Sequence, residues 1–149
     1  MAYEPIHMTW DYDDGPRAGI ADFQGQPHYF ACAFDSEHPQ YAEAFTLTPL
    51  DEETFGWARE HWAIWRHWEA EVHAGRQTPE SHPKYGHYDP RYNELEALID
   101  GGIDRLAARA TLRHGRFRIA SVPGELFPGQ FRQFEVEWAE MEPAATAPE

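Results

Sequence analysis

The chain is poor in cysteine and lysine, with one of each, Cys32 and Lys84, among its 149 residues. A single cysteine cannot form an internal disulfide, and it excludes a zinc site built from several thiolates. No run of about eighteen apolar residues is present, and residues 1–10 lack the basic start and apolar stretch of a secretion signal. We therefore expect a soluble, cytoplasmic protein.

Basic residues are also scarce. Twelve of them stand against twenty-six acidic residues, which gives a formal net charge of −14. This charge opposes adsorption to nucleic-acid phosphates and to anionic membranes, and it would attract basic proteins. We expect no nucleic-acid or membrane partner and favour another protein as the partner.

The usual signatures of a nucleophilic or phosphate-binding enzyme are missing. None of the three serines stands in a glycine-flanked elbow, and Gly101 and Gly102 lack the rest of a phosphate-binding loop. Cys32 lies within an alternating apolar segment, where cysteine acts as a small hydrophobe. No catalytic residue and no cofactor are predicted, and the balance favours a protein that is not an enzyme.

Five segments alternate in the manner of β-strands. Residues 17–23 and 28–34 are joined by Gln24–Pro27, which predicts a hairpin whose second strand turns His28, Phe30, Cys32 and Phe34 inward. Residues 41–47 predict a third strand. The segments 116–119 and 134–138 predict two final strands, whose outward arginines would face glutamates if the strands are neighbours.

Two helices are expected between the third and fourth strands. Thr48 followed by Pro49 predicts the start of a long helix that ends near Ala74 and Gly75. Asp89 and Pro90 repeat the same start for a shorter helix, which Gly101 and Gly102 should interrupt.

These elements predict an α+β fold with the order βββααββ. A small antiparallel sheet of about five strands would pack on the long and the short helix, and closure of that sheet into a barrel stays open. Residues 1–142 are expected to form a single domain, and residues 143–149 a disordered acidic tail.

The long helix carries the first candidate site. Four of the six tryptophans lie between Thr48 and Gly75. At about 100° per residue, one arc collects three of these tryptophans around a histidine. A ligand or partner surface is therefore predicted at Trp57, His61, Trp65 and Trp68, although a tryptophan stripe on a helix is more often core.

Two further groups are candidates. An acid-free segment supplies arginines for an anion or an acidic partner, or for cross-strand ion pairs: Arg109, Arg113, Arg116 and Arg118. The loop after the long helix supplies metal-ligand types, or histidines held by ordinary hydrogen bonds: His73, His82, His87 and Asp89.

The run from Tyr12 to Phe34, with Asp14–Pro16, Gly19–Phe23, Gly25 and Pro27–His28, together with Leu47–Pro49 and the tryptophan-rich helix, resembles a family of small acidic bacterial proteins of unknown function. The resemblance implies a bacterial origin and a domain that spans most of the chain. It implies no activity, cofactor or functional residue.

The leading hypothesis is a non-enzymatic protein-interaction or regulatory protein, for which an inhibitor or immunity role is one concrete form, and a homodimer stays open. One alternative is a metal-dependent enzyme whose loop histidines would hold a metal that activates water. The other is a small-molecule binder with a pocket lined by tryptophan and histidine.

Overall fold

A computed structural model of the protein describes residues 2–12, 15–33, 43–85, 89–120 and 134–141. It confirms the α+β class. The main elements, in chain order, are β1 (Glu4–Tyr12), β2 (Pro16–Phe23), β3 (Gln26–Cys32), β4 (Ala44–Pro49), α1 (Glu52–His73), α2 (Pro90–Leu106), β5 (Thr111–Ile119) and β6 (Phe134–Glu140). Short 3₁₀ helices cover Pro79–Ser81, Pro83–Tyr85 and Ala107–Arg109.

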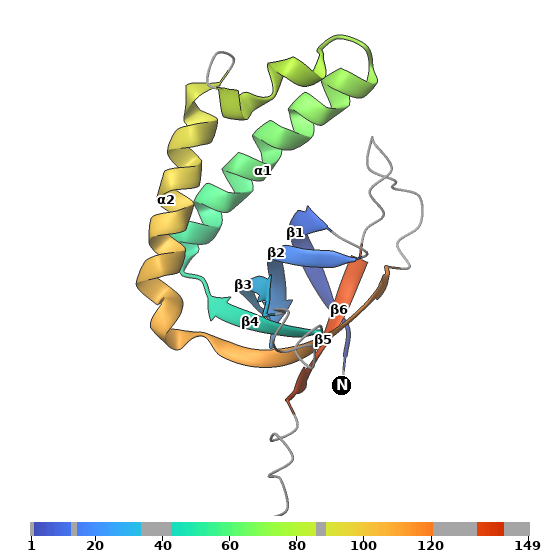
Figure 1. Ribbon diagram of the computed structural model, residues 1–149. Helices are drawn as coiled ribbons and strands as arrows, with labels where there is room; N and C mark the ends of the chain where they lie inside the picture. The colour runs from blue at the N-terminus through green and yellow to red at the C-terminus, as the bar shows by residue number, and fades with distance from the viewer. Residues whose placement is uncertain (1, 13–14, 34–42, 86–88, 121–133, 142–149) are drawn as a thin grey trace, which may run out of the picture. The chain divides into compact units, whose positions relative to one another are not determined.

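The strands form a closed antiparallel barrel in which each strand pairs with its neighbours in the chain and β1 pairs with β6 (Figure 1). The antiparallel sheet is thus closed into a barrel, the possibility that the sequence left open, and the predicted strand count is corrected from about five to six. The prediction of about five strands in the order βββααββ omitted β1. That strand alternates buried Ile6 and Met8 with less buried neighbours, and its pairing with both β2 and β6 closes the sheet.

The β2–β3 hairpin confirms the clearest prediction from the sequence. Ala21 pairs with His28, and the connection is a two-residue turn in which Gln24 has φ 54° and Gly25 has φ 77°. Positive φ at both central residues matches the twist of a tight hairpin. His28 and Phe30 are buried as expected, whereas Phe34 lies outside the described residues.

The barrel interior is aromatic. Phe30, Phe45, Phe117 and Trp138 lie with ring centroids 5.3 to 6.0 Å apart. Their rings meet mostly edge to face or tilted, the geometries that aromatic quadrupoles favour. The buried core cluster consists of Ile6, Ala21, Phe30, Phe45, Leu47, Val136 and Trp138.

The last two strands are neighbours, so their arginines and glutamates face each other as expected for that case. Arg116 lies opposite Glu137, and Arg118 lies opposite Glu135, with which it forms an ion pair. The Arg118 guanidinium also lies 3.6 Å from the centroid of the Tyr3 ring. This arginine is therefore held by a cation–π contact and an acid.

The start of α1 differs from the prediction. Thr48 and Pro49 end β4, and the N-cap is Asp51, whose Oδ1 accepts a hydrogen bond from the Thr54 N–H at 2.8 Å. Hydrogen bonds from Thr54, and then the Arg105 guanidinium, lower the pKa of Asp51 to about 2. A charged acceptor at the positive end of the helix is a stronger cap than the predicted hydroxyl.

The other helix boundaries follow the sequence, with one exception. α1 ends at His73 before Gly75, which has φ 77°, and the Arg91 N–H donates to Asp89 Oδ1 at the start of α2. The exception is the predicted interruption of α2, which is wrong. The helix continues through Gly101 and Gly102 to Leu106. Gly102 lies against Thr54 of α1, so this glycine serves close helix packing rather than a helix break.

The chain forms two compact units. The first contains the six strands, and the second contains α1 and α2, which form a hairpin tied by ion pairs between Arg91 and Glu60 and between Arg105 and Asp51. The predicted packing of the sheet on the helices stays a prediction, and residues 143–149 lie outside the described part. Neither α1 nor α2, as described, is apolar enough over its length to span a bilayer.

Candidate functional site

One end of the barrel contains a hollow of about 400 Å³. Its volume lies within the range of about 300–1,000 Å³ that is typical of small-molecule sites, and barrel mouths are common places for such sites. The lining comes from the facing ends of β1 and β2, from the start of β4, and from β5 and β6: Tyr12, Gly15, Pro16, Arg17, Glu43, Phe45, His114, Gly115, Arg116, Phe117 and Phe134.

Four aromatic rings give this barrel hollow its apolar surface. Phe45 and Phe117 lie 5.3 Å apart between ring centroids and belong to the aromatic core, so they join the hollow to the rigid interior. Tyr12 and Phe134 lie 6.0 Å apart, from β1 and β6. Tyr12 is 48% exposed, which makes it an aromatic wall that solvent reaches.

Position 115, which lines the hollow, has room for glycine alone. A Cβ at this position would lie 2.7 Å from the Trp138 ring and 3.0 Å from the Phe45 ring. Trp138 is the residue opposite Gly115 on β6, so the indole covers the glycine across the strand pair. The close contact fixes the rings next to the hollow.

Charged groups line the same hollow. Arg17 and Arg116 are among the described lining residues, and the Arg17 Nη1 donates to the Cys32 Sγ at 3.7 Å. Glu43 contributes the single carboxylate among the described lining residues, and its Oε2 lies 3.2 Å from His114 Nε2. The described part of the lining therefore combines aromatic rings with charged and polar residues.

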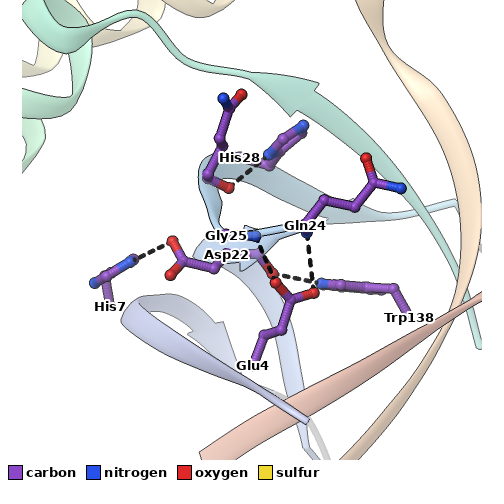
Figure 2. A network of polar contacts seen from close by, with 8 residues as sticks. Glu4, His7, Asp22, Gln24, Gly25, His28 and Trp138 are labelled. Carbon is purple, nitrogen blue, oxygen red and sulfur yellow. Dashed lines mark hydrogen bonds and ion pairs between the residues drawn. The ribbon is translucent and has the colours of Figure 1, made fainter. Parts of the chain in front are cut away.

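A polar network at the other end of β2 has a structural role (Figure 2). The Glu4 carboxylate accepts hydrogen bonds from the backbone N–H groups of Gln24 and Gly25, at 3.1 and 2.8 Å. Trp138 Nε1 donates to the carbonyl of Asp22 at 3.0 Å, and His7 Nε2 donates to the Asp22 carboxylate at 2.7 Å. These bonds hold the β2–β3 turn against β1 and β6.

The four arginines of the predicted anion patch have different environments. Arg109 is exposed in a 3₁₀ helix, and Arg113 places its guanidinium 5.3 Å from the centroid of the Phe23 ring. Arg118 is held by Tyr3 and Glu135. Of these four, Arg116 lines the barrel hollow.

In the helical unit, two histidines pack against one tyrosine. His61 is 6% exposed, and its ring stacks on Tyr92 with centroids 4.0 Å apart. His82 meets the edge of the same tyrosine at 5.7 Å and lies 4.6 Å from the Trp68 ring. Trp68 Nε1 donates to the Ser81 hydroxyl at 3.0 Å, so the 3₁₀ turn is fixed to α1.

Burial dominates the protonation of this cluster. It lowers the pKa of His61 below the usual value of 6.5, although Glu96, whose Oε1 lies 3.3 Å from His61 Nε2, acts in the opposite direction. Burial also lowers the pKa of His82, and it raises the pKa of Tyr92 to about 12. The cluster is therefore held in its neutral form at neutral pH.

The depressed pKa of His61 predicts a pH-dependent stability. Below about pH 6.5 the unfolded chain binds a proton that folded His61 resists, so the free energy of unfolding should fall as the pH is lowered. His61→Phe keeps a ring against Tyr92 but cannot titrate. Urea unfolding at several values between about pH 7 and pH 5 should show a smaller pH slope in this variant than in the wild type.

His67→Phe is the matched control, because it makes the same change at an exposed histidine of α1. Its pH slope should remain that of the wild type. An unchanged slope in His61→Phe would contradict the assignment of this titration to His61.

The predicted tryptophan surface is divided between different contacts. His61 and Trp68 belong to the cluster around Tyr92 and His82, whereas Trp65 stacks on Trp62 with centroids 5.0 Å apart. Trp57 is half-buried. A smaller hollow of about 140 Å³ touches Trp68, and neither Trp57, His61 nor Trp65 is among its described lining residues.

The predicted metal ligands have other contacts in the described part of the chain. His82 Nδ1 accepts from the Lys84 N–H at 3.1 Å, and Asp89 caps α2. His73 is exposed at the end of α1, and His87 lies outside the described residues. Among the residues that are described, no three histidine, cysteine or acidic side chains are grouped as a metal site.

Comparison with known proteins adds no family assignment: no family model, no curated protein and no solved structure matches this chain. The evidence for a site is therefore the geometry of the chain itself.

Most of the hollow was not predicted from the sequence. Of its described lining residues, only Arg116 was a candidate beforehand, because the hollow joins residues that are up to about 120 positions apart, from Tyr12 to Phe134. The usable signal was the cluster of Tyr12, Gly15, Pro16 and Arg17 at one turn. This cluster points to the hollow once β1 is recognised as a strand, because Tyr12 at its end lies 6.0 Å from Phe134 of β6 between ring centroids.

Proposed function

We propose that this protein binds a small organic molecule in the barrel hollow. The observation that carries the proposal is the hollow itself, which has a volume of about 400 Å³, aromatic walls and a few polar groups. Apolar surface supplies most of the affinity of such sites, and a few placed polar groups orient the ligand.

The rigidity of the surroundings also supports a binding role. Phe45 and Phe117 form part of the wall and pack into the barrel core, so their positions are set before a ligand arrives. A preformed wall reduces the entropy that binding must overcome. Tyr12 and Phe134 add two rings, one of them accessible to solvent.

N-Phenyl-1-naphthylamine is a suitable first probe, because it is uncharged and aromatic and its fluorescence rises in apolar surroundings. We expect saturable binding to the full chain. Tyr12→Ala should weaken this binding about fivefold, since an aromatic contact contributes about 1 kcal/mol, and it should change the free energy of unfolding little.

Ile119→Ala is the matched control. Ile119 is also 48% exposed, lies on the same barrel and is not part of the hollow's described lining. Its affinity for the probe should equal that of the wild type. Equal losses in both variants, or no saturable binding by the wild type, would contradict the proposal.

The other hypotheses from the sequence keep their own tests. A non-enzymatic protein partner, the leading hypothesis before the structure, stays a prediction supported by the charge of −14. Ligand binding is compatible with a regulatory role of that kind. A small-molecule site is retained from the alternatives, but it is placed in the barrel rather than along the tryptophans of α1.

A further inference from the structure

We propose that His82 acts as a pH-sensitive switch in the helical unit: with a neutral ring it holds the 3₁₀ turn Pro83–Tyr85 in place, and protonation of the ring releases this turn. The proposal is independent of a ligand in the barrel. It follows from the direction of one hydrogen bond, from the contacts on either side of His82 and from the charges near its ring.

The hydrogen bond from Lys84 requires a neutral imidazole. The backbone N–H of Lys84 can only donate, and its nitrogen lies 3.1 Å from Nδ1 of His82. Nδ1 is therefore the unprotonated, accepting nitrogen, because an imidazolium carries a proton on both nitrogens. Protonation converts this acceptor into a donor, so two donors then face each other.

Two other histidines have hydrogen bonds of the opposite direction. His28 Nδ1 donates to the carbonyl oxygen of Gln26 at 2.8 Å, and His61 Nε2 lies 3.3 Å from the Glu96 carboxylate. A carbonyl and a carboxylate accept from a protonated ring as well as from a neutral one. Protonation therefore preserves these two bonds and breaks that of His82.

Anchors on both sides of His82 connect this segment to the helices. Before it, the Ser81 hydroxyl accepts from Trp68 Nε1 of α1 at 3.0 Å. After it, the Lys84 carbonyl accepts from Asn93 Nδ2 of α2 at 2.9 Å. Loss of the bond to His82 therefore loosens the residue through which the turn contacts α2.

The ring of His82 packs against aromatic groups of both helices. Its centroid lies 4.6 Å from that of Trp68 on α1 and 5.7 Å from that of Tyr92 on α2. These rings would attract an imidazolium through cation–π contacts. They do not restore the lost bond, and rotation of the ring does not either, because both nitrogens of an imidazolium are donors.

The groups near the ring shift its protonation in both directions. Burial is the main cause that lowers the pKa of His82, and the Lys84 ammonium and His61 of α1 add to it. Glu96 of α2 acts in the opposite direction. An exposed histidine titrates near pH 6.5, so the turn should be held above about pH 6.5 and released as the pH falls below that value. Further titratable residues line the smaller hollow together with Ser81 and Pro83: His67, Glu71 and Asp89.

The test uses the single lysine of the chain. Endoproteinase Lys-C cuts after lysine, so its one site is Lys84 in the turn itself. The cleavage rate follows the population of the open turn when opening is fast. Divided by the rate for a synthetic peptide of residues 78–90 at the same pH, the rate for the full chain should rise about three- to tenfold from about pH 7.5 to about pH 5.5. EDTA in every buffer removes metal ions.

Three variants assign this rise to one side chain. His82→Asn places an amide oxygen near the position of Nδ1 and cannot titrate, so its relative rate should stay within about twofold over the same range. His82→Ala has no acceptor at this position and should be cut faster than the wild type at neutral pH, with little dependence on pH. His87→Asn changes the next histidine along the chain and should keep the rise of the wild type.

Several results would overturn the proposal. They are a flat relative rate in the wild type, a rise that persists in His82→Asn, and a rise that His87→Asn abolishes. Loss of the helical circular dichroism signal at about pH 5.5 would show unfolding of the whole unit rather than release of the turn, and would overturn it too. A long-range ¹H–¹⁵N correlation spectrum tests the starting point: at neutral pH, Nδ1 should be unprotonated in His82 and protonated in His28. A proton on Nδ1 of His82 would contradict the switch.

Discussion

Replacing Gly19 with alanine should destabilise the barrel by more than about 4 kcal/mol, an exceptional cost for one methyl group. A Cβ at this position would lie 2.0 Å from the carbonyl oxygen of Met8 and 2.9 Å from its carbonyl carbon. Both atoms belong to the backbone of β1, so no rotamer change relieves the overlap. The two strands would have to separate where Thr9 pairs with Gly19.

Urea unfolding followed by circular dichroism measures this effect. Gly25→Ala is a useful control, because Gly25 has φ 77° but no atom within 4 Å of an added Cβ. It should cost only about 1–2 kcal/mol, the price of left-handed backbone for alanine. A loss in Gly19→Ala no larger than that of Gly25→Ala would contradict the close approach of β1 and β2.

The adjacent glycines of α2 should respond to alanine with opposite signs. A Cβ at Gly102 would lie 2.3 Å from Thr54 Oγ1 and 3.1 Å from Thr54 Cβ, so Gly102→Ala should cost about 1–3 kcal/mol by forcing α1 and α2 apart. Gly101 has nothing within 4 Å, and Gly101→Ala should gain up to about 1 kcal/mol from helix propensity.

Thermal or urea unfolding of both variants shows whether each one raises or lowers the free energy of unfolding. Gly102→Ala should destabilise the protein less when it is made in a Thr54→Ala background than when it is made in the wild type, because the overlapping hydroxyl and methyl of Thr54 are then absent. If Gly101→Ala and Gly102→Ala stabilised the protein equally, the packing of α2 on Thr54 would be wrong.

Local sequence signals predicted the local structure well. The hairpin after Phe23, the end of α1 before Gly75 and the Asp89 cap each depend on a few adjacent residues and were found as expected, although the turn itself is the two residues Gln24 and Gly25 rather than the predicted four from Gln24 to Pro27. The last two strands are also neighbours, and arginines face glutamates across them, as expected for that case. In these cases the chemistry that decides the structure lies within a few positions or along a single ladder.

Predictions failed where a distant contact decides the conformation. Thr48 has the chemistry of a helix cap, but it belongs to β4, where its backbone pairs with Tyr29 of β3. Asp51 caps the helix instead. Gly101 and Gly102 resemble a helix break, yet α2 continues through both, and Gly102 allows close contact with Thr54 of α1. β1 is a different case, because Ile6, Met8 and Trp10 alternate with their neighbours as in a strand and its main partner is the adjacent β2, so the local signal was present and was overlooked.

The candidate site was hidden by distance in the sequence. The barrel hollow exists only when β1, β2, β4, β5 and β6 are brought together, and no short motif contains its residues. The tryptophans of α1 were conspicuous in sequence, but several of them form contacts within the helical unit. Conspicuous composition was therefore a poor guide to the location of the hollow.

The most direct test of a ligand site in the barrel is an amide ¹H–¹⁵N correlation spectrum of the full chain titrated with 1-anilinonaphthalene-8-sulfonate. We predict that the largest shifts fall on Gly15, Arg17, Gly115 and Arg116, which line the hollow, while Gly101 on α2 remains unmoved. Shifts concentrated on α1 and α2, or none at saturating probe, would contradict a binding site in the barrel.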